Sequence, residues 1–131
     1  MENIKIGDIV QAEYNTGIYI GKVIEDRRNF FLVQVHAVIK HPIQGDLHNR
    51  GKVEGVAFHE RKALAYNEKM NAKKRKVQPY HGTIPEYSIS LKNAVEAFKQ
   101  ELKKLDTDYH RLSLQKLHDL ENDFYKKIYN E

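Results

Sequence analysis

The spacing of apolar residues changes once along this chain, at Pro85, and this change limits the folds that the chain can adopt. Before Pro85, apolar and polar residues alternate, which is the period of two that indicates half-buried β-strands. After Pro85, apolar residues recur every three or four positions, as they do on one face of a helix. The sequence therefore predicts an α+β fold in which strands come first and helices follow.

Residues 4–40 are expected to form three strands joined by turns at 15–17 and 26–29. The alternation is clearest in the third strand, where one face carries Phe31, Val33, Val35, Ala37 and Ile39. Further short strands are expected at 53–58, 63–66 and 77–80. Pro79 confines the last of them to a sheet edge, because proline has no amide hydrogen to donate. Short antiparallel strands with a long connection after the third predict a small SH3-like β-barrel over residues 1–82.

Residues 83–131 are predicted to form an antiparallel helical hairpin. Pro85 suits the first turn of a helix, and Thr107 or Asp108 can cap a second one. Helices are expected at 85–105 and 108–129, each with an apolar stripe. The stripes comprise Tyr87, Leu91, Val95, Phe98, Leu102 and Leu105 in the first helix and Tyr109, Leu112, Leu117, Leu120, Phe124 and Ile128 in the second. Because an isolated hairpin is marginally stable, we expect this one to dock on the barrel.

Two stretches between the strands, 40–49 and 58–66, hold more polar side chains than a tight turn needs. Pro42 stiffens the entry to the first, Gly45 suits a positive φ, and Asp46 can cap local amides. The remaining side chains are expected to face outward and to bind a partner. The candidate partner-binding residues are His41, Gln44, Asp46, His48, Asn49, His59, Glu60 and Arg61, with Ile43, Leu47, Tyr66 and Tyr80 as apolar anchors. In the other interpretation, the same residues lock the connection onto the barrel, and both can hold in part.

The sequence offers little that indicates catalysis or metal binding. The chain has no cysteine, which excludes disulfides, thiolate metal sites and cysteine nucleophiles. His41, His48 and His59 do not have the short spacing at which metal ligands usually recur. No serine lies in a nucleophile elbow, and no phosphate-binding glycine motif occurs. We therefore expect a non-enzymatic protein without catalytic residues, cofactor, metal or small-molecule substrate.

Four consecutive basic residues at 73–76 suggest an alternative function in a chain of net charge +4. Such a run can contact phosphates, so a nucleic-acid-binding SH3-like barrel is the second hypothesis. We expect instead a solvated hairpin tip, because the nearby basic residues alternate with Glu54, Glu60 and Glu68 and form no basic stripe. Nucleic acid is therefore not the partner that the sequence favours.

Four segments strongly resemble the kinase-associated protein B family of sporulating bacilli. They are residues 14–21, 40–49, 58–66 and 77–82. The resemblance covers most of residues 1–105 and is weaker in the last helix. It implies an accessory protein that promotes the activity or assembly of a membrane sensor histidine kinase in the sporulation phosphorelay, through protein–protein interaction. It assigns no role to individual residues.

The sequence also leads us to expect a cytoplasmic protein. No apolar run approaches the roughly 20 residues of a membrane span, and the first residues lack the apolar core of a signal peptide. Contact with the membrane is expected only indirectly, at its inner face through the kinase. Members of the resembled family are often labelled lipoproteins, which requires a lipid-bearing cysteine, so this chain is not expected to be lipidated in that way. The sequence does not indicate the oligomeric state.

Overall fold

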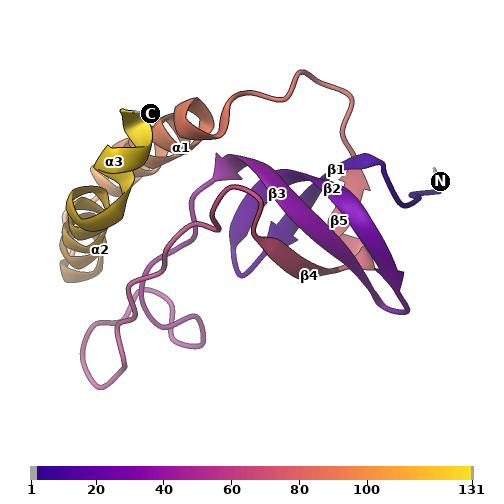
Figure 1. Ribbon diagram of the computed structural model, residues 1–131. Coiled ribbons are helices and arrows are strands. Elements are labelled where there is room, and N and C mark those ends of the chain that lie inside the picture. Colours follow the sequence, from indigo (N-terminus) through magenta and orange to yellow (C-terminus); the bar gives the residue numbers. More distant parts are fainter. Residues whose placement is uncertain (1–2, 131) are drawn as a thin grey trace.

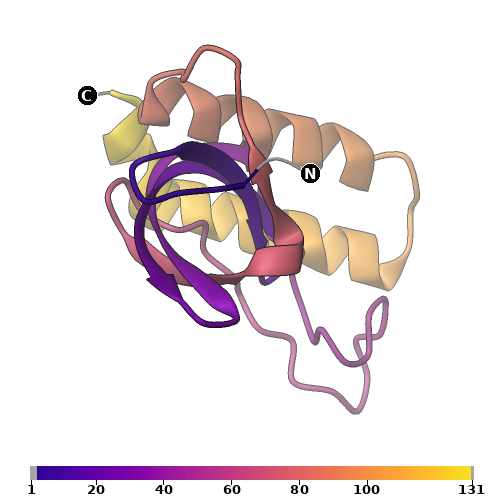
Figure 2. The same cartoon turned by 90° about the vertical axis from the view of Figure 1, so that its right-hand side faces the viewer.

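The structure is a computed structural model that describes residues 3–130, and it consists of one antiparallel sheet followed by helices (Figure 1). The strands are β1 (Ile9–Tyr14), β2 (Gly17–Arg27), β3 (Phe30–Lys40), β4 (Lys69–Lys73) and β5 (Val77–Pro79). They lie in the order β4-β3-β2-β1-β5. The sheet curls until β1 also contacts β4, as its rounded outline in Figure 2 shows. The predicted α+β fold, a barrel-like sheet followed by helices, is confirmed.

The curl of the sheet arises mainly between β2 and β3. Their register shifts at three places, between Ile18 and Tyr19, between Ile20 and Gly21, and between Val23 and Glu25. Each irregularity adds local twist and bends the strand. At Gly21 the two backbones approach so closely that a Cβ atom would lie 2.4 Å from the carbonyl oxygen of Gln34. Only glycine fits there, so the bend depends on this residue.

The strands predicted at 53–58 and 63–66 are wrong, because residues 41–68 contain neither helix nor strand. The fourth strand is β4, in which Met70 and Ala72 are buried while the alternate residues are exposed. The predicted hairpin tip at 73–76 is in fact a short turn of 3-10 helix over Lys74–Lys76, which joins β4 to β5. The strand expected at 77–80 is confirmed as β5, at the edge of the sheet.

The helices agree with the predicted hairpin apart from their ends. They are α1 (Tyr87–Leu102), α2 (Asp108–Leu120), a π-helical turn (Glu121–Tyr125) and α3 (Lys126–Tyr129). Figure 2 shows the long helices side by side and antiparallel behind the sheet. The amide of Val38 in β3 donates a 3.0 Å hydrogen bond to Ser90 Oγ in α1, which fastens the hairpin to the sheet.

The π-helical turn changes which residues of the last helical segment face the core. A π-turn holds one more residue than an α-helical turn, so every later side chain is rotated relative to the preceding stripe. Phe124, expected on the stripe, is 41% exposed, and Tyr125 is fully buried instead. The prediction for Phe124 is therefore wrong, and Tyr125 takes its place.

One cluster of buried apolar side chains joins the sheet and the helices. It includes Val23, Val33 and Val35 from the strands and Leu91, Val95, Leu117 and Leu120 from the helices. The docking of the hairpin on the sheet follows from this shared core. The division of the chain into domains at 1–82 and 83–131 stays a prediction.

Replacing Thr107 by Ala should lower the free energy of unfolding by about 1 kcal/mol. The Thr107 side chain accepts a 3.1 Å hydrogen bond from the His110 amide, so of the two predicted candidates, Thr107 and Asp108, Thr107 caps the second helix. Urea unfolding followed by circular dichroism measures the change. Thr83→Ala, in the exposed linker before α1, is the control and should cost less than about 0.5 kcal/mol. Equal losses in the two variants would show that the cap contributes nothing.

Candidate partner-binding loops

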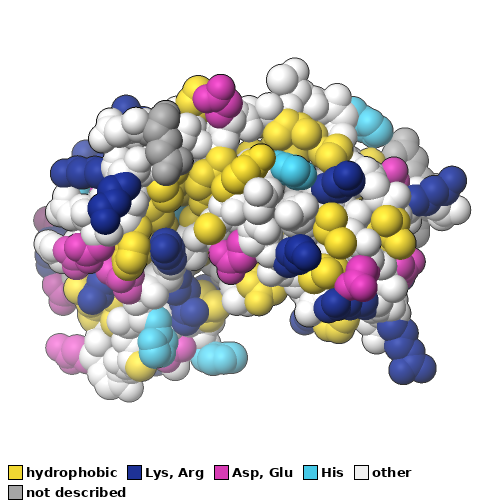
Figure 3. Space-filling view, viewed as in Figure 1, with side chains coloured by type: hydrophobic (Ala, Val, Ile, Leu, Met, Phe, Trp, Pro, Cys, Tyr) yellow, Lys and Arg dark blue, Asp and Glu magenta, His cyan; other side chains and the backbone are white. Residues whose placement is uncertain are grey.

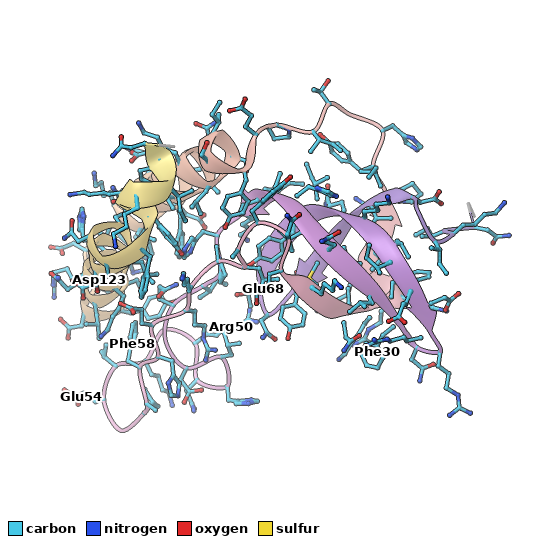
Figure 4. All side chains as sticks on the ribbon, viewed as in Figure 1. Phe30, Arg50, Glu54, Phe58, Glu68 and Asp123 are labelled. Carbon is cyan, nitrogen blue, oxygen red and sulfur yellow. The ribbon has the colours of Figure 1, made fainter. Side chains whose placement is uncertain are left out.

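The long connection between β3 and β4, residues 41–68, leaves the sheet and extends below the helices (Figure 1). In Figure 4, Glu54 marks its tip and Phe58 lies on the returning arm, near α2. A connection of this length without regular structure is uncommon in a compact protein and usually has a function. Its shape depends on a few side chains that replace the missing strand partners.

Gln44 joins the outgoing and returning arms of the connection. Its side-chain nitrogen donates to the carbonyl oxygens of Arg61 (2.8 Å) and Pro42 (3.1 Å), and its oxygen accepts the Arg61 amide at 2.8 Å. Arg61 Nε in turn donates to the Gly45 carbonyl at 3.0 Å, and the Gly45 amide donates to His59 at 2.9 Å. Gln44 is only 1% exposed, so the expectation that it faces outward is wrong. Its amide is needed to satisfy the buried backbone of both arms.

His41 is fully buried and links the long connection between β3 and β4 to the last helical segment. Its Nδ1 lies 2.9 Å from the Pro42 carbonyl oxygen, which can only accept, so Nδ1 carries the hydrogen. Nε2 then accepts from the Tyr125 hydroxyl at 2.8 Å, and the Tyr125 oxygen accepts the Ala63 amide at 2.9 Å. Burial lowers the pKa of His41 to about 4, so the ring is neutral near pH 7. The expected outward orientation of His41 is wrong too.

A second set of contacts holds the loop on α2. Gly45 has φ +97°, as predicted, and a Cβ atom there would lie 2.8 Å from the Phe58 ring. The Phe58 ring packs edge-to-face on Tyr109, with centroids 5.9 Å apart. The Tyr109 hydroxyl donates to the Gln44 carbonyl at 3.2 Å. The turn at Gly45 therefore lets both arms lie against the helix.

The other six predicted residues lie wholly or partly at the surface. Asp46 caps the His48 amide at 2.9 Å and accepts from the Asn49 side chain at 3.2 Å. These two hydrogen bonds lower the pKa of the Asp46 carboxyl. We call this set the loop surface, and it comprises Asp46, His48, Asn49, His59, Glu60 and Arg61. His41 and Gln44 thus brace the fold, and the partner role of the loop surface stays a prediction.

Sequence reasoning missed three residues that hold the connection in place. Thr16 Oγ1 accepts the Ile43 amide at 2.9 Å, and Thr16 itself has φ +71°, which is unusual for a β-branched residue. The Tyr19 hydroxyl accepts the Leu64 amide at 3.2 Å, and Tyr125 holds both arms. A buried tyrosine hydroxyl requires a hydrogen-bond partner. This requirement was an available signal for Tyr19, which lies in a predicted strand, but not for Tyr125, whose burial depends on the π-helical turn.

The remaining sequence hypotheses concern charge, metal and membrane. Lys74 Nζ lies 2.5 Å from Asp26 and Lys76 Nζ 2.7 Å from Glu13, so half of the basic run is paired. Within residues 3–130, no three histidine or acidic side chains are grouped closely enough to hold a metal ion. Over the same residues, no helix has the length and hydrophobicity that crossing a bilayer requires.

Comparisons with known proteins place these elements in a family. The family model of kinase associated protein B matches residues 14–125. Kinase-associated lipoprotein B of Bacillus subtilis (strain 168) is 39% identical over 127 residues, which cover 97% of this chain and 99% of that protein. The crystal structure of kinase-associated protein B from Bacillus cereus is similar with a TM-score of 0.79 at 35% identity, covering 93% of this chain and 98% of that one. These similarities include the sheet, the long connection and the helices.

Proposed function

The chain belongs to the kinase-associated protein B family, and from this premise we propose that it is a non-enzymatic accessory protein of a sensor histidine kinase. The kinase is one that feeds the sporulation phosphorelay, and the accessory protein promotes its activity or assembly by direct binding. The protein acts in the cytoplasm and reaches the membrane only through its partner. Support comes from relatives named for association with a kinase, one of which matches almost the whole chain.

The observation that carries the choice of interface is the rigid base of the loop surface. His41 and Gln44 are buried and fully hydrogen-bonded, so the arms that present the outward residues are held in one arrangement. A surface that is ordered before binding loses little conformational entropy when the partner arrives. The outward residues offer two carboxylates, one guanidinium, one amide and two imidazoles, which suit a polar rim around a protein contact.

The alternative function, nucleic-acid binding through residues 73–76, has less support. The pairs Lys74–Asp26 and Lys76–Glu13 neutralise half of the run, and the Lys74 ammonium also lies 4.8 Å from the centroid of the Phe31 ring. A phosphate-binding stripe requires cations that are free to replace counterions. The paired run is better suited to fastening the 3-10 turn onto the sheet.

Combined replacement of His48, His59 and Glu60 by Ala should weaken kinase binding by about tenfold or more, because three contact residues together are expected to contribute at least about 1.4 kcal/mol. All three side chains are exposed, so the fold should remain intact by circular dichroism. Biolayer interferometry against a purified sensor histidine kinase in nanodiscs measures the affinity.

The matched control removes two exposed charges from the basic run, Lys73→Ala with Arg75→Ala. Its affinity should stay within about threefold of the parent at 0.15 M salt, where exposed charges are largely screened. Normal binding by the loop variant together with lost binding by the control would transfer the interface to residues 73–76.

A further inference from the structure

A concave surface that contains none of the loop-surface residues lies between the sheet and the start of α1. It encloses about 390 Å³ and is lined by His36, Tyr66, Ile84, Pro85, Glu86, Tyr87, Ser88 and Ile128. We call it the linker groove, because the segment that joins β5 to α1 forms one wall. Figure 3 shows hydrophobic side chains gathered where this segment crosses from the sheet to the helices. Apart from Tyr66, which the sequence suggested as an anchor of the partner-binding stretches, neither candidate function uses the residues that line it.

Three aromatic rings form a continuous wall of the linker groove. The ring centroids of His36 and Tyr66 are 6.2 Å apart, and those of Tyr66 and Tyr87 are 6.0 Å apart. The Tyr87 hydroxyl donates to the Leu64 carbonyl at 2.5 Å, which fixes the orientation of the Tyr87 ring. Tyr66 is 55% exposed and Ile84 is also exposed, so apolar surface faces solvent. A preformed apolar groove with few polar groups is typical of a binding site.

The charge of the linker groove is opposite to that of the chain. Among the described residues that line it there is no lysine or arginine, although the sequence contains 22 of them. Glu86 contributes a carboxylate at the rim. Burial is the main cause of the raised pKa of Tyr87, and the Tyr19 hydroxyl and the Glu68 carboxylate raise it further. The Glu68 carboxylate accepts the Ala65 amide at 2.8 Å and does not itself line the groove. Figure 4 labels Glu68 beside the turn that enters β4.

We propose that the linker groove binds a peptide segment of a protein partner in which apolar side chains are flanked by lysine or arginine. The apolar side chains would cover the rings of Tyr66 and Tyr87, and a flanking cation would pair with Glu86. A cation held near an exposed tyrosine ring gains a further attraction. The proposal rests on the proposed function only for the source of the segment, which would be the kinase.

The linker groove is tested with two short synthetic peptides that share leucines and one tryptophan and differ only in lysine or glutamate at the other positions. The chain contains no tryptophan, so the emission of the peptide reports binding without background. The lysine peptide should bind saturably to the full chain, and the glutamate peptide should bind at least about tenfold more weakly. Glu86→Lys should reverse this preference, and Tyr66→Ala should abolish binding.

Ile89→Ser is the matched control. Ile89 lies in the first turn of α1, as Tyr87 does, and is 53% exposed, but it does not line the linker groove. Its variant should bind the lysine peptide as the parent does. Absence of binding, equal binding of both peptides, or equal losses in Tyr66→Ala and Ile89→Ser would overturn the proposal. Dimerisation seen by sedimentation velocity and lost in Tyr66→Ala would assign the groove to a second copy of the chain, and would also overturn it.

The same measurements separate the linker groove from the proposed function. The variant with Ala at 48, 59 and 60 should bind the lysine peptide normally, because its substitutions lie outside the groove. Peptide binding without any kinase binding would leave the groove standing and refute the proposed function. Kinase binding without peptide binding would support the proposed function and overturn the proposal for the linker groove.

Discussion

Replacing Tyr125 by Ala should lower the free energy of unfolding by about 3 to 5 kcal/mol, whereas Phe124→Ala should cost less than about 1 kcal/mol. Tyr125 is fully buried, and its hydroxyl bonds to both His41 and the Ala63 amide. Phe124 is 41% exposed, with the Lys62 ammonium 4.0 Å from its ring centroid. Urea unfolding monitored by circular dichroism compares the two variants. The contrast arises from the single extra residue in the π-helical turn.

A third variant separates the hydroxyl of Tyr125 from its ring. Tyr125→Phe keeps the packing but leaves the Ala63 amide and His41 Nε2 without their partner, so it should cost about 1 to 3 kcal/mol. Similar losses from Phe124→Ala and Tyr125→Ala would mean that the helix continues without the π-turn. A negligible loss from Tyr125→Phe would mean that the hydroxyl does not hold the two arms.

Acidification from pH 6.5 to pH 4 should remove about 3 kcal/mol of stability through His41 alone. Burial lowers the pKa of His41 from 6.5 in the unfolded chain to about 4 in the folded one. Between these values the unfolded chain binds a proton that the folded chain excludes, so the unfolding free energy falls as the pH falls. The contribution of His41 to stability is complete above pH 6.5, decreases as the pH falls from 6.5 towards 4, and is lost below about pH 4.

The contribution of His41 is isolated by comparing pH profiles. His41→Gln cannot titrate, so its unfolding free energy should decline less steeply over this range, by about 1.4 kcal/mol per pH unit. The carboxylates that titrate in both proteins cancel in the difference. Thr83→Ala, at an exposed position that does not titrate, should retain the slope of the parent. Parallel profiles for His41→Gln and the parent would contradict a neutral buried ring.

Elements with a clear local pattern could be predicted from the sequence, and β4 could not. The alternation in β1 to β3 and the Pro79 edge position depend on neighbouring residues, which the sequence displays. In β4 only Met70 and Ala72 are apolar, and the flanking lysines conceal so short a pattern. Residues 53–58 resembled a strand. However, the arm that they enter is held through the backbone of Arg61, which pairs with the Gln44 side chain instead of a neighbouring strand.

In the candidate site too, features that depend on neighbouring residues could be predicted, and features that depend on distant residues could not. The positive φ of Gly45, the cap formed by Asp46 and the cap formed by Thr107 each involve residues no more than three positions apart. The first two were predicted, and Thr107 was one of the two residues predicted for the cap of the second helix. The burial of His41 depends on Tyr125, which lies 84 residues further along the chain. The π-turn that directs Tyr125 inward has no known local signature in this sequence, so the orientation of His41 could not be deduced.

The closure of the two arms at Gly45 and His59 has a consequence for how the length of the connection can vary. The 2.9 Å backbone hydrogen bond between them already brings together the ends of the segment 46–58. Inserting residues near Glu54 would therefore lengthen a loop whose ends are held, and each doubling of its length costs only about 0.6 kcal/mol in closure entropy. The clamp formed by Gln44 and Arg61 would be untouched. The tip can thus gain or lose residues, and its contacts can change, while the sheet and the helices keep their structure.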